Sequence, residues 1–168
     1  KDGAGPGSPE LPRGREQWLR LMSLLTVVVL RSYGGVIMSF PWKTGAWAWI
    51  AALCVVGGKC IGGFASDRFG EVRSATVTLS AAAAALIFSA FPLPGALGLL
   101  LFNMSMPVTL YAARDILREG RATAFGLLTL GLFLGMLPAF SGASGSGQDY
   151  AMICLISIML IRVGVGKR

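Results

Sequence analysis

Six long apolar runs, separated by five short connectors, dominate the pattern of this chain. Their lengths lie near the roughly 20 apolar residues that a helix needs to cross a bilayer. The runs do not alternate polar and apolar residues as the strands of a membrane barrel do. Lipid also leaves open backbone groups without partners, which favours helices. The sequence therefore predicts an all-α membrane protein with six transmembrane helices. The predicted helices are residues 19–40, 46–65, 74–91, 95–113, 122–140 and 150–165.

Composition supports a membrane protein with one folded domain. Apolar residues make up 54% and charged residues 14% of the sequence, whereas a soluble domain carries about 25% charged residues. We expect a six-helix domain over residues 18–168, preceded by a flexible cytoplasmic segment over residues 1–17. The Gly- and Pro-rich start, residues 1–12, lacks the apolar core of a signal peptide. It is interpreted either as a cloning remnant or as the tail of an interdomain loop.

Positive charge alternates from one connector to the next. The net charge is +7, but basic residues gather at the chain ends and in the second and fourth connectors, while the other connectors hold only Lys43. Basic residues collect on the cytoplasmic side of a membrane, so this alternation predicts that both termini are cytoplasmic. It also argues against a nucleic-acid partner. The residues on the basic side are Arg13, Arg15, Arg20, Arg68, Arg73, Arg114, Arg118, Arg121, Arg162, Lys167 and Arg168.

The chain lacks the residues of common catalytic and metal sites. It has no His, and Cys54, Cys60 and Cys154 lie inside predicted helices without forming a Cys-x-x-Cys pair. This pattern argues against a zinc site or a disulfide framework. No nucleophile and base occur at a usable spacing, and no glycine-rich nucleotide loop is present. We therefore expect neither an enzyme nor a bound cofactor.

The connector between the second and third runs contains a Gly-x-x-x-Asp-Arg-x-Gly loop. Gly70 permits a tight turn because it has no Cβ. Asp67 can accept hydrogen bonds from a helix N-terminus, and Arg68 can pair with a carboxylate or a lipid phosphate. The alternative interpretation is that both charges only solvate a short connector. The four fixed positions are Gly63, Asp67, Arg68 and Gly70.

This loop resembles the signature loop of the major facilitator superfamily, which joins the second and third helices of each six-helix half. The match departs at Glu71, where a basic residue is usual. Residues 29–33 and 124–138 resemble the second halves of bacterial efflux members, particularly the fosmidomycin-resistance group. The resemblance implies the C-terminal half of a transporter in the bacterial inner membrane, folded as a 3+3 inverted repeat. It also implies that Asp67 and Arg68 help to close the cytoplasmic gate.

Two basic residues lie more than one turn inside predicted helices, where lipid makes a charge costly. Arg31 is about 18 Å into the first helix, and a mid-membrane Arg costs on the order of 2.5–3.5 kcal/mol. Its position favours either a solute pathway or a structural pairing. Lys59 lies one to two turns from the cytoplasmic end of the second predicted helix, so it either contacts solute or extends to the lipid surface. Tyr33 and Asn103 are further candidates for solute contacts, although Asn103 also suits a bond to a neighbouring helix.

Prolines and paired glycines indicate how the helices bend and pack. Pro107 and Pro138 are expected to kink the fourth and fifth helices and to open backbone carbonyls. Glycines spaced four apart let helix backbones approach closely, which we interpret as packing inside the bundle, with a dimer face as the alternative. The two pairs are Gly58–Gly62 and Gly131–Gly135.

Two functions from different classes fit this sequence. The first is half of a secondary transporter, which moves a small organic solute, an anion if Arg31 binds it, by alternating access with a second six-helix half. That partner is either an identical copy or a missing N-terminal half. It would supply any proton-coupling carboxylate, because no Asp or Glu lies inside a predicted helix. The second function is a non-transporting membrane scaffold derived from such a half. Membrane lipid surrounds the chain in both cases.

Overall fold

A computed structural model describes residues 14–116, 121–142 and 144–165. These residues form helices and connectors, and no strand occurs among them, which confirms the predicted all-α class. Residues 1–13 of the expected flexible segment lie outside the described residues, and the first helix already begins at Arg15. The elements are α1 (Arg15–Ile37), α2 (Ala46–Phe69), α3 (Glu71–Ile87), α4 (Pro92–Asn103), α5 (Met106–Ile116), α6 (Arg121–Met136), the 3-10 helix η1 (Leu137–Ser141) and α7 (Gly147–Val165).

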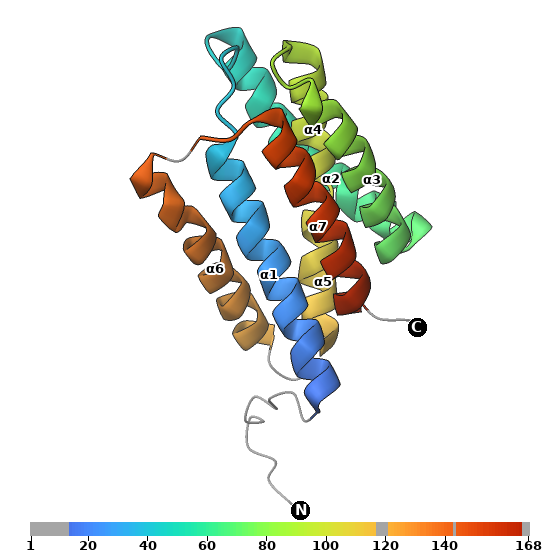
Figure 1. Ribbon diagram of the computed structural model, residues 1–168. Coiled ribbons are helices and arrows are strands. Elements are labelled where there is room, and N and C mark those ends of the chain that lie inside the picture. The colour runs from blue at the N-terminus through green and yellow to red at the C-terminus, as the bar shows by residue number, and fades with distance from the viewer. Residues whose placement is uncertain (1–13, 117–120, 143, 166–168) are drawn as a thin grey trace, which may run out of the picture.

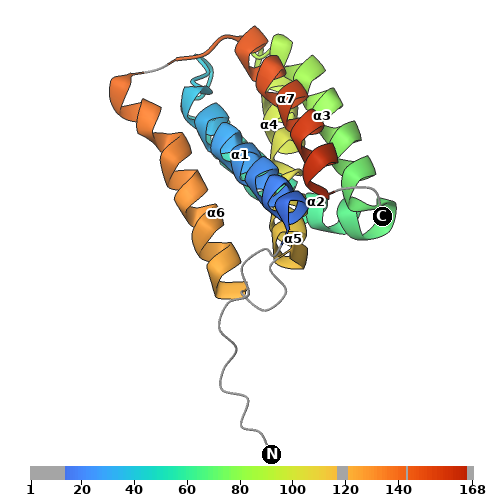
Figure 2. The ribbon, with the colours of Figure 1, turned by 60° about the horizontal axis from the view of Figure 1, so that its bottom comes forward.

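The described helices form six rods, which run alternately up and down (Figure 1). α4 and α5 follow one another as a single broken rod, and η1 extends the rod that begins with α6. The start of α1 and the end of α7 consequently lie at the same end of the bundle, which we call the termini end. Figures 1 and 2 both place α6 at one edge of the bundle beside α1.

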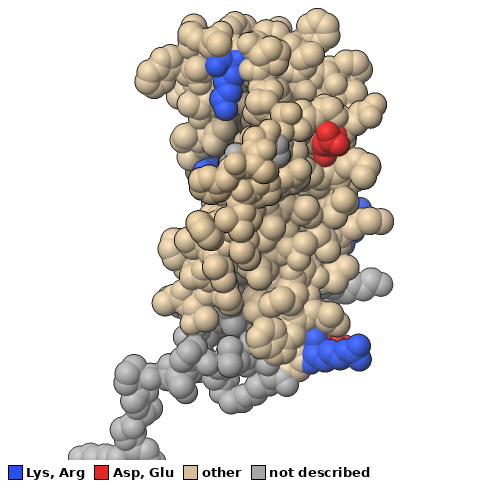
Figure 3. Space-filling view, turned by 60° about the vertical axis from the view of Figure 1, so that its left-hand side comes forward, with Lys and Arg blue, Asp and Glu red and all other residues tan. Residues whose placement is uncertain are grey.

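Four of these rods are long and apolar enough to cross a membrane: α1, α2, the Pro92–Ile116 rod and α7. The α3 helix has 17 residues and α6 has 16, so both are shorter than the roughly 20 residues of a typical span. The described chain is thus compatible with a membrane protein by length and composition. Figure 3 shows a face whose wide middle is almost entirely free of charged side chains.

The packing of the rods follows a regular scheme. α1 packs against α6 and α7, while the α4–α5 rod packs against α2 and α3. α3 and α7 also pack against each other, and together they join the two groups of helices. α2 and α6 therefore lie at the periphery. The buried core runs between α1, α3, α4 and α7, where Val27, Leu79, Leu86 and Cys154 are almost fully enclosed.

Each predicted glycine pair lies where two helix backbones meet. Gly58 and Gly62 of α2 contact the backbone of Leu100 and Met104 on the neighbouring rod. On α6, Gly135 contacts the Val29 carbonyl and Ser32 of α1, and Gly131 contacts the side chains of Leu25 and Val28. This placement agrees with packing inside the bundle, because a side chain at these positions would collide with the neighbouring helix. The described structure uses both pairs within one chain.

Aromatic residues tie the rods together at the end opposite the termini. The Trp42 indole Nε1 donates to the Ser89 carbonyl at 2.8 Å. The Tyr150 hydroxyl lies 2.9 Å from the Ile37 carbonyl and 2.7 Å from the Gly145 carbonyl. The Phe40 ring stacks on Trp42 with ring centroids 5.1 Å apart and meets the Tyr150 ring edge-on at 5.8 Å. These contacts connect α1, α3 and α7 through side chains and backbone.

The α2 glycines provide a test of this packing. Gly62→Leu should lower the free energy of unfolding by roughly 1–3 kcal/mol, because the added side chain overpacks the contact with Met104. Gly57→Leu is the matched control, since a Cβ at Gly57 meets no atom within 4 Å, and it should not lower stability. Reversible unfolding of the purified chain in mixed detergent and SDS micelles measures both values. Equal losses in the two variants would contradict the close approach of α2 to the broken rod.

Candidate functional site

The break between α4 and α5 is the most unusual feature of the described bundle. α4 ends at Asn103 and α5 begins at Met106. Pro107 has no backbone N–H, so it cannot donate to the Asn103 carbonyl four residues earlier, as a regular helix would require. The break lies about 17 Å from Pro92 and about 15 Å from Ile116 at 1.5 Å per residue. An unpaired carbonyl is therefore created near the middle of the rod.

Arg31 of α1 binds this carbonyl. Its Nη2 atom donates to the Asn103 carbonyl at 3.2 Å and to Asn103 Oδ1 at 3.1 Å, and its Nη1 atom donates to Ser105 Oγ at 2.6 Å. The Phe102 ring centroid lies 5.3 Å from the Arg31 guanidinium carbon. Arg31 retains only 7% of its accessible surface. The guanidinium therefore replaces the donor that Pro107 lacks and joins α1 to the end of α4 and to the break itself.

Two further bonds hold these acceptors in place. The Asn103 side-chain amide donates to the Leu99 carbonyl at 2.8 Å, which directs its oxygen toward Arg31. The Ser105 hydroxyl donates to the Phe102 carbonyl at 2.9 Å, so its lone pairs face the guanidinium. Among the described residues, all groups that accept hydrogen bonds from Arg31 are uncharged. A buried cation with neutral partners keeps most of its cost of leaving water.

The predicted solute-binding residues do not all meet at this site. Arg31 and Asn103 are in direct contact, whereas the half-buried Tyr33 packs against the apolar core. Lys59 is exposed on α2. The sequence places Lys59 within two turns of the end of its helix, but α2 continues to Phe69, ten residues beyond Lys59. The end of α2 is therefore four residues farther from Lys59 than the sequence predicts.

Sequence reasoning missed Ser105 and Phe102. Both are common residues in an apolar run, and their roles depend on contact with a side chain more than 70 positions earlier in the chain. One signal was available, because Pro107 identifies the Asn103 carbonyl as the group that its own helix leaves without a donor. That rule locates an acceptor, but it does not identify the donor.

The Gly-x-x-x-Asp-Arg-x-Gly segment is helical for most of its length. Gly63 to Phe69 belong to the last turns of α2, so the prediction of a loop was wrong there, and the connector to α3 is Gly70 alone. Gly70 has a φ of 85°, which confirms the expected tight turn. The helix persists because polar side chains in a last turn reach water without leaving helical geometry.

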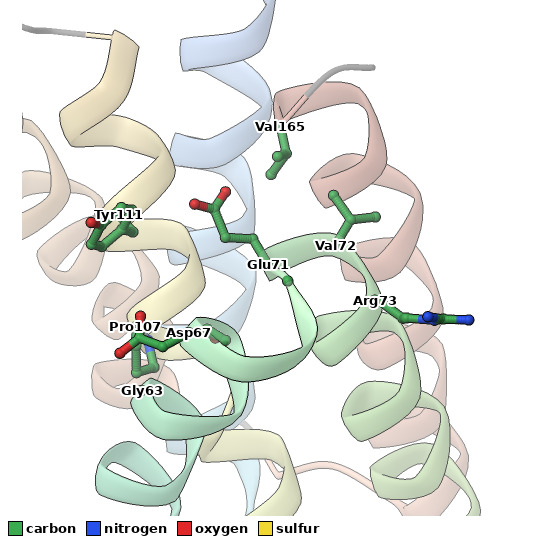
Figure 4. Close-up of a pocket in the computed structure, with 10 residues that line it drawn as sticks. Gly63, Asp67, Glu71, Val72, Arg73, Pro107, Tyr111 and Val165 are labelled. Carbon is green, nitrogen blue, oxygen red and sulfur yellow. The ribbon is translucent and has the colours of Figure 1, made fainter. Parts of the chain in front are cut away.

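A groove of about 760 Å³ lies beside this segment at the termini end. Figure 4 shows Asp67 directed toward Pro107, Glu71 directed into the groove and Arg73 directed away from it. Gly63, Asp67 and Gly70 thus come together, whereas Arg68 does not line the groove. The lining residues are Gly63, Ser66, Asp67, Gly70, Glu71, Val72, Arg73, Pro107, Tyr111 and Val165.

Comparisons of the chain with protein-family models, with curated proteins and with solved structures found no match. The arrangement of the described residues therefore carries the functional argument.

A double-mutant cycle tests the contact between Arg31 and Asn103. Asn103→Leu should cost about 1–3 kcal/mol of stability, because it leaves Arg31 short of an acceptor.

Arg31→Met combined with Asn103→Leu should cost less than the sum of the two single changes, by about 1–2 kcal/mol, because residues in contact are coupled. Thr129→Val on α6 is the control, since its exposed hydroxyl bonds only the Phe125 carbonyl of its own helix. Unfolding of each variant in mixed micelles gives the four free energies. Strictly additive losses would show that Arg31 and Asn103 do not interact.

Proposed function

We propose that this chain is a six-helix half of a secondary transporter of the major facilitator type. It lies in a bacterial inner membrane with both termini in the cytoplasm. It moves a small organic anion by alternating access together with a second six-helix half, which is either an identical copy or the missing N-terminal half of a longer protein. α3 and the rod of α6 and η1 complete the set of six membrane spans.

The pattern of packing gives this proposal its strongest support. In chain order, α1, α2 and α3 correspond to the broken rod, the rod of α6 and η1, and α7. Replacing each rod by its counterpart converts the α1–α6 contact into the contact between the broken rod and α2. The same exchange converts the α1–α7 contact into the contact between the broken rod and α3. Each group holds three rods, so the second group runs opposite to the first. An inverted repeat of this kind is a common plan of secondary transporters.

The glycine contacts repeat in the same way. Gly58 and Gly62 lie on the second rod and contact the fourth, while Gly131 and Gly135 lie on the fifth rod and contact the first. The two groups therefore share a packing detail as well as an order of neighbours. Residues 19–91 and 95–165 show no visible sequence similarity, so this support comes from the contacts alone.

The broken rod supplies the proposed anion site. Discontinuous helices bind substrates near the bilayer midplane in several transporter folds. A carboxylate or phosphonate would accept the two Arg31 donors that now bind Ser105 and Asn103, and a charged acceptor makes the stronger bond. The groove beside Asp67 and Gly70 lies at the end where the proposed gate closes.

A scaffold without transport activity is the second candidate, and one observation favours it. Ser105 and Asn103 already accept hydrogen bonds from Arg31, and the guanidinium is almost completely buried. A solute has to displace these bonds before it can bind. Arg31 then serves to pair α1 with the broken rod, and the second half is a partner for assembly rather than for alternating access.

Accessibility of introduced cysteines tests the six-span topology. In a chain whose native cysteines are replaced by Ala, the substitutions Lys43→Cys, Ala90→Cys and Ser144→Cys should react with a membrane-impermeant maleimide added outside intact cells. Arg73→Cys and Arg114→Cys should react only after the membrane is permeabilised, because they lie at the opposite end of the bundle. Labelling of all five positions from one side would overturn the topology.

Ligand-dependent stability tests the transport proposal. The full chain, purified with any second half that accompanies it, is heated with monocarboxylates, dicarboxylates, phosphonates and sugar phosphates. A bound anion at about 100 times its Kd should stabilise the protein by about 2.7 kcal/mol. Arg31→Met should abolish the response, whereas Lys43→Gln at the far end should retain it. Absence of any response across the panel would favour the scaffold.

A further inference from the structure

The α2 helix leaves most of its surface uncovered. Within the described bundle it packs mainly against α3, α4 and α5. In its most apolar 18-residue window 17% of residues are buried, compared with 39% in α1 and in α7 and 61% in the Pro92–Ile116 rod. Lipid or another polypeptide must cover the remainder of α2.

The uncovered surface has two different faces. One face carries the large, exposed side chains of Trp49, Leu53 and Phe64, which suit contact with acyl chains. The other face, which we call the Lys59 face, follows positions three and four apart along the helix. Its residues are Ala48, Ala52, Val55, Lys59, Gly63 and Ser66.

The position of Lys59 along α2 determines what can neutralise its charge. Lys59 lies about 15 Å from Phe69 and about 20 Å from Ala46 at 1.5 Å per residue. Its neighbour Gly58 contacts Leu100 and Asn103, so Lys59 is level with the break in the α4–α5 rod. The nearest charged residue toward the end of α2 is Asp67, about 12 Å along the helix from Lys59, and a four-carbon side chain covers only part of that distance. Among the described residues no carboxylate forms an ion pair with Lys59.

We propose that the Lys59 face binds a transmembrane helix of a second membrane domain, and that this helix carries an Asp or Glu level with Lys59. A carboxylate at that level neutralises the ammonium where lipid cannot, and intramembrane charges commonly pair in this way. Ala52 has a short side chain and Gly63 has none, so both let a helix backbone come close. The inference requires the chain to lie in a bilayer, but it does not require transport.

A second copy of the chain does not fit this role. A symmetric contact through the Lys59 face brings one ammonium toward the other, which is unfavourable. The acidic residues of the described chain lie at helix ends and not at the level of Lys59: Glu16, Asp67, Glu71, Asp115 and Asp149. The carboxylate therefore comes from a different sequence.

Photocrosslinking in membranes of the source organism tests the proposal. The crosslinking amino acid benzoylphenylalanine replaces Ala52 on the Lys59 face, and Ile61 on the opposite side of α2 serves as the matched control. Ala52→benzoylphenylalanine should give a protein adduct whose sequenced peptide is a membrane helix containing Asp or Glu. Ile61→benzoylphenylalanine should give lipid adducts only. Lipid adducts alone at both positions, an adduct with a second copy, or a partner helix without a carboxylate would each overturn the proposal.

Charge exchange then tests the ion pair itself. Lys59→Glu should reduce the protein adduct at Ala52 at least tenfold, and an Asp or Glu to Lys change in the identified helix should restore it. Lys59→Arg should retain the adduct. If Lys59→Glu fails to accumulate, the neutral Lys59→Gln provides the same comparison. Unchanged adduct yield in the charge variants would show that the pair does not form, whatever the result of the anion-binding experiment.

Discussion

The carbonyl that Pro107 leaves without a donor constrains the whole bundle. In a bilayer no water is available to satisfy such a group, so the protein has to supply a donor from another helix. Arg31 provides it, and its second nitrogen binds Ser105 within the break. The relative height of α1 and the broken rod is thereby fixed. A proline and an arginine that are each unfavourable in a membrane helix offset one another here.

Close backbone contacts organise the remaining helices around this connection. The peripheral α2 and α6 each bring a pair of glycines against one of the two connected rods. α3 and α7 close the arrangement by packing against each other. Two cations therefore lie at the same level of the bundle: Arg31 is enclosed by neutral acceptors, and Lys59 faces outward. Both side chains place positive charge at this level.

The helices and their approximate places could be predicted from hydrophobicity, because burial in lipid depends on composition over about 20 residues. Gly70 and the glycine pairs could also be predicted, since the absence of a Cβ has a direct geometric meaning. The end of α2 could not, because Ser66, Asp67 and Arg68 have the polarity of a loop. The break in the 95–113 run was predicted only as a kink at Pro107. Arg31 was recognised as unusual, but its partners lie more than 70 residues away, and no local pattern identifies them.

The separation of Arg31 from Asn103 along the chain also has a consequence for biosynthesis. The 72 positions that separate them take roughly 4–14 s to translate at the usual speed of a ribosome. During that interval the guanidinium of α1 lacks its final acceptors. In a membrane, the newly made first helix would therefore have to keep its guanidinium hydrated until the fourth rod emerges.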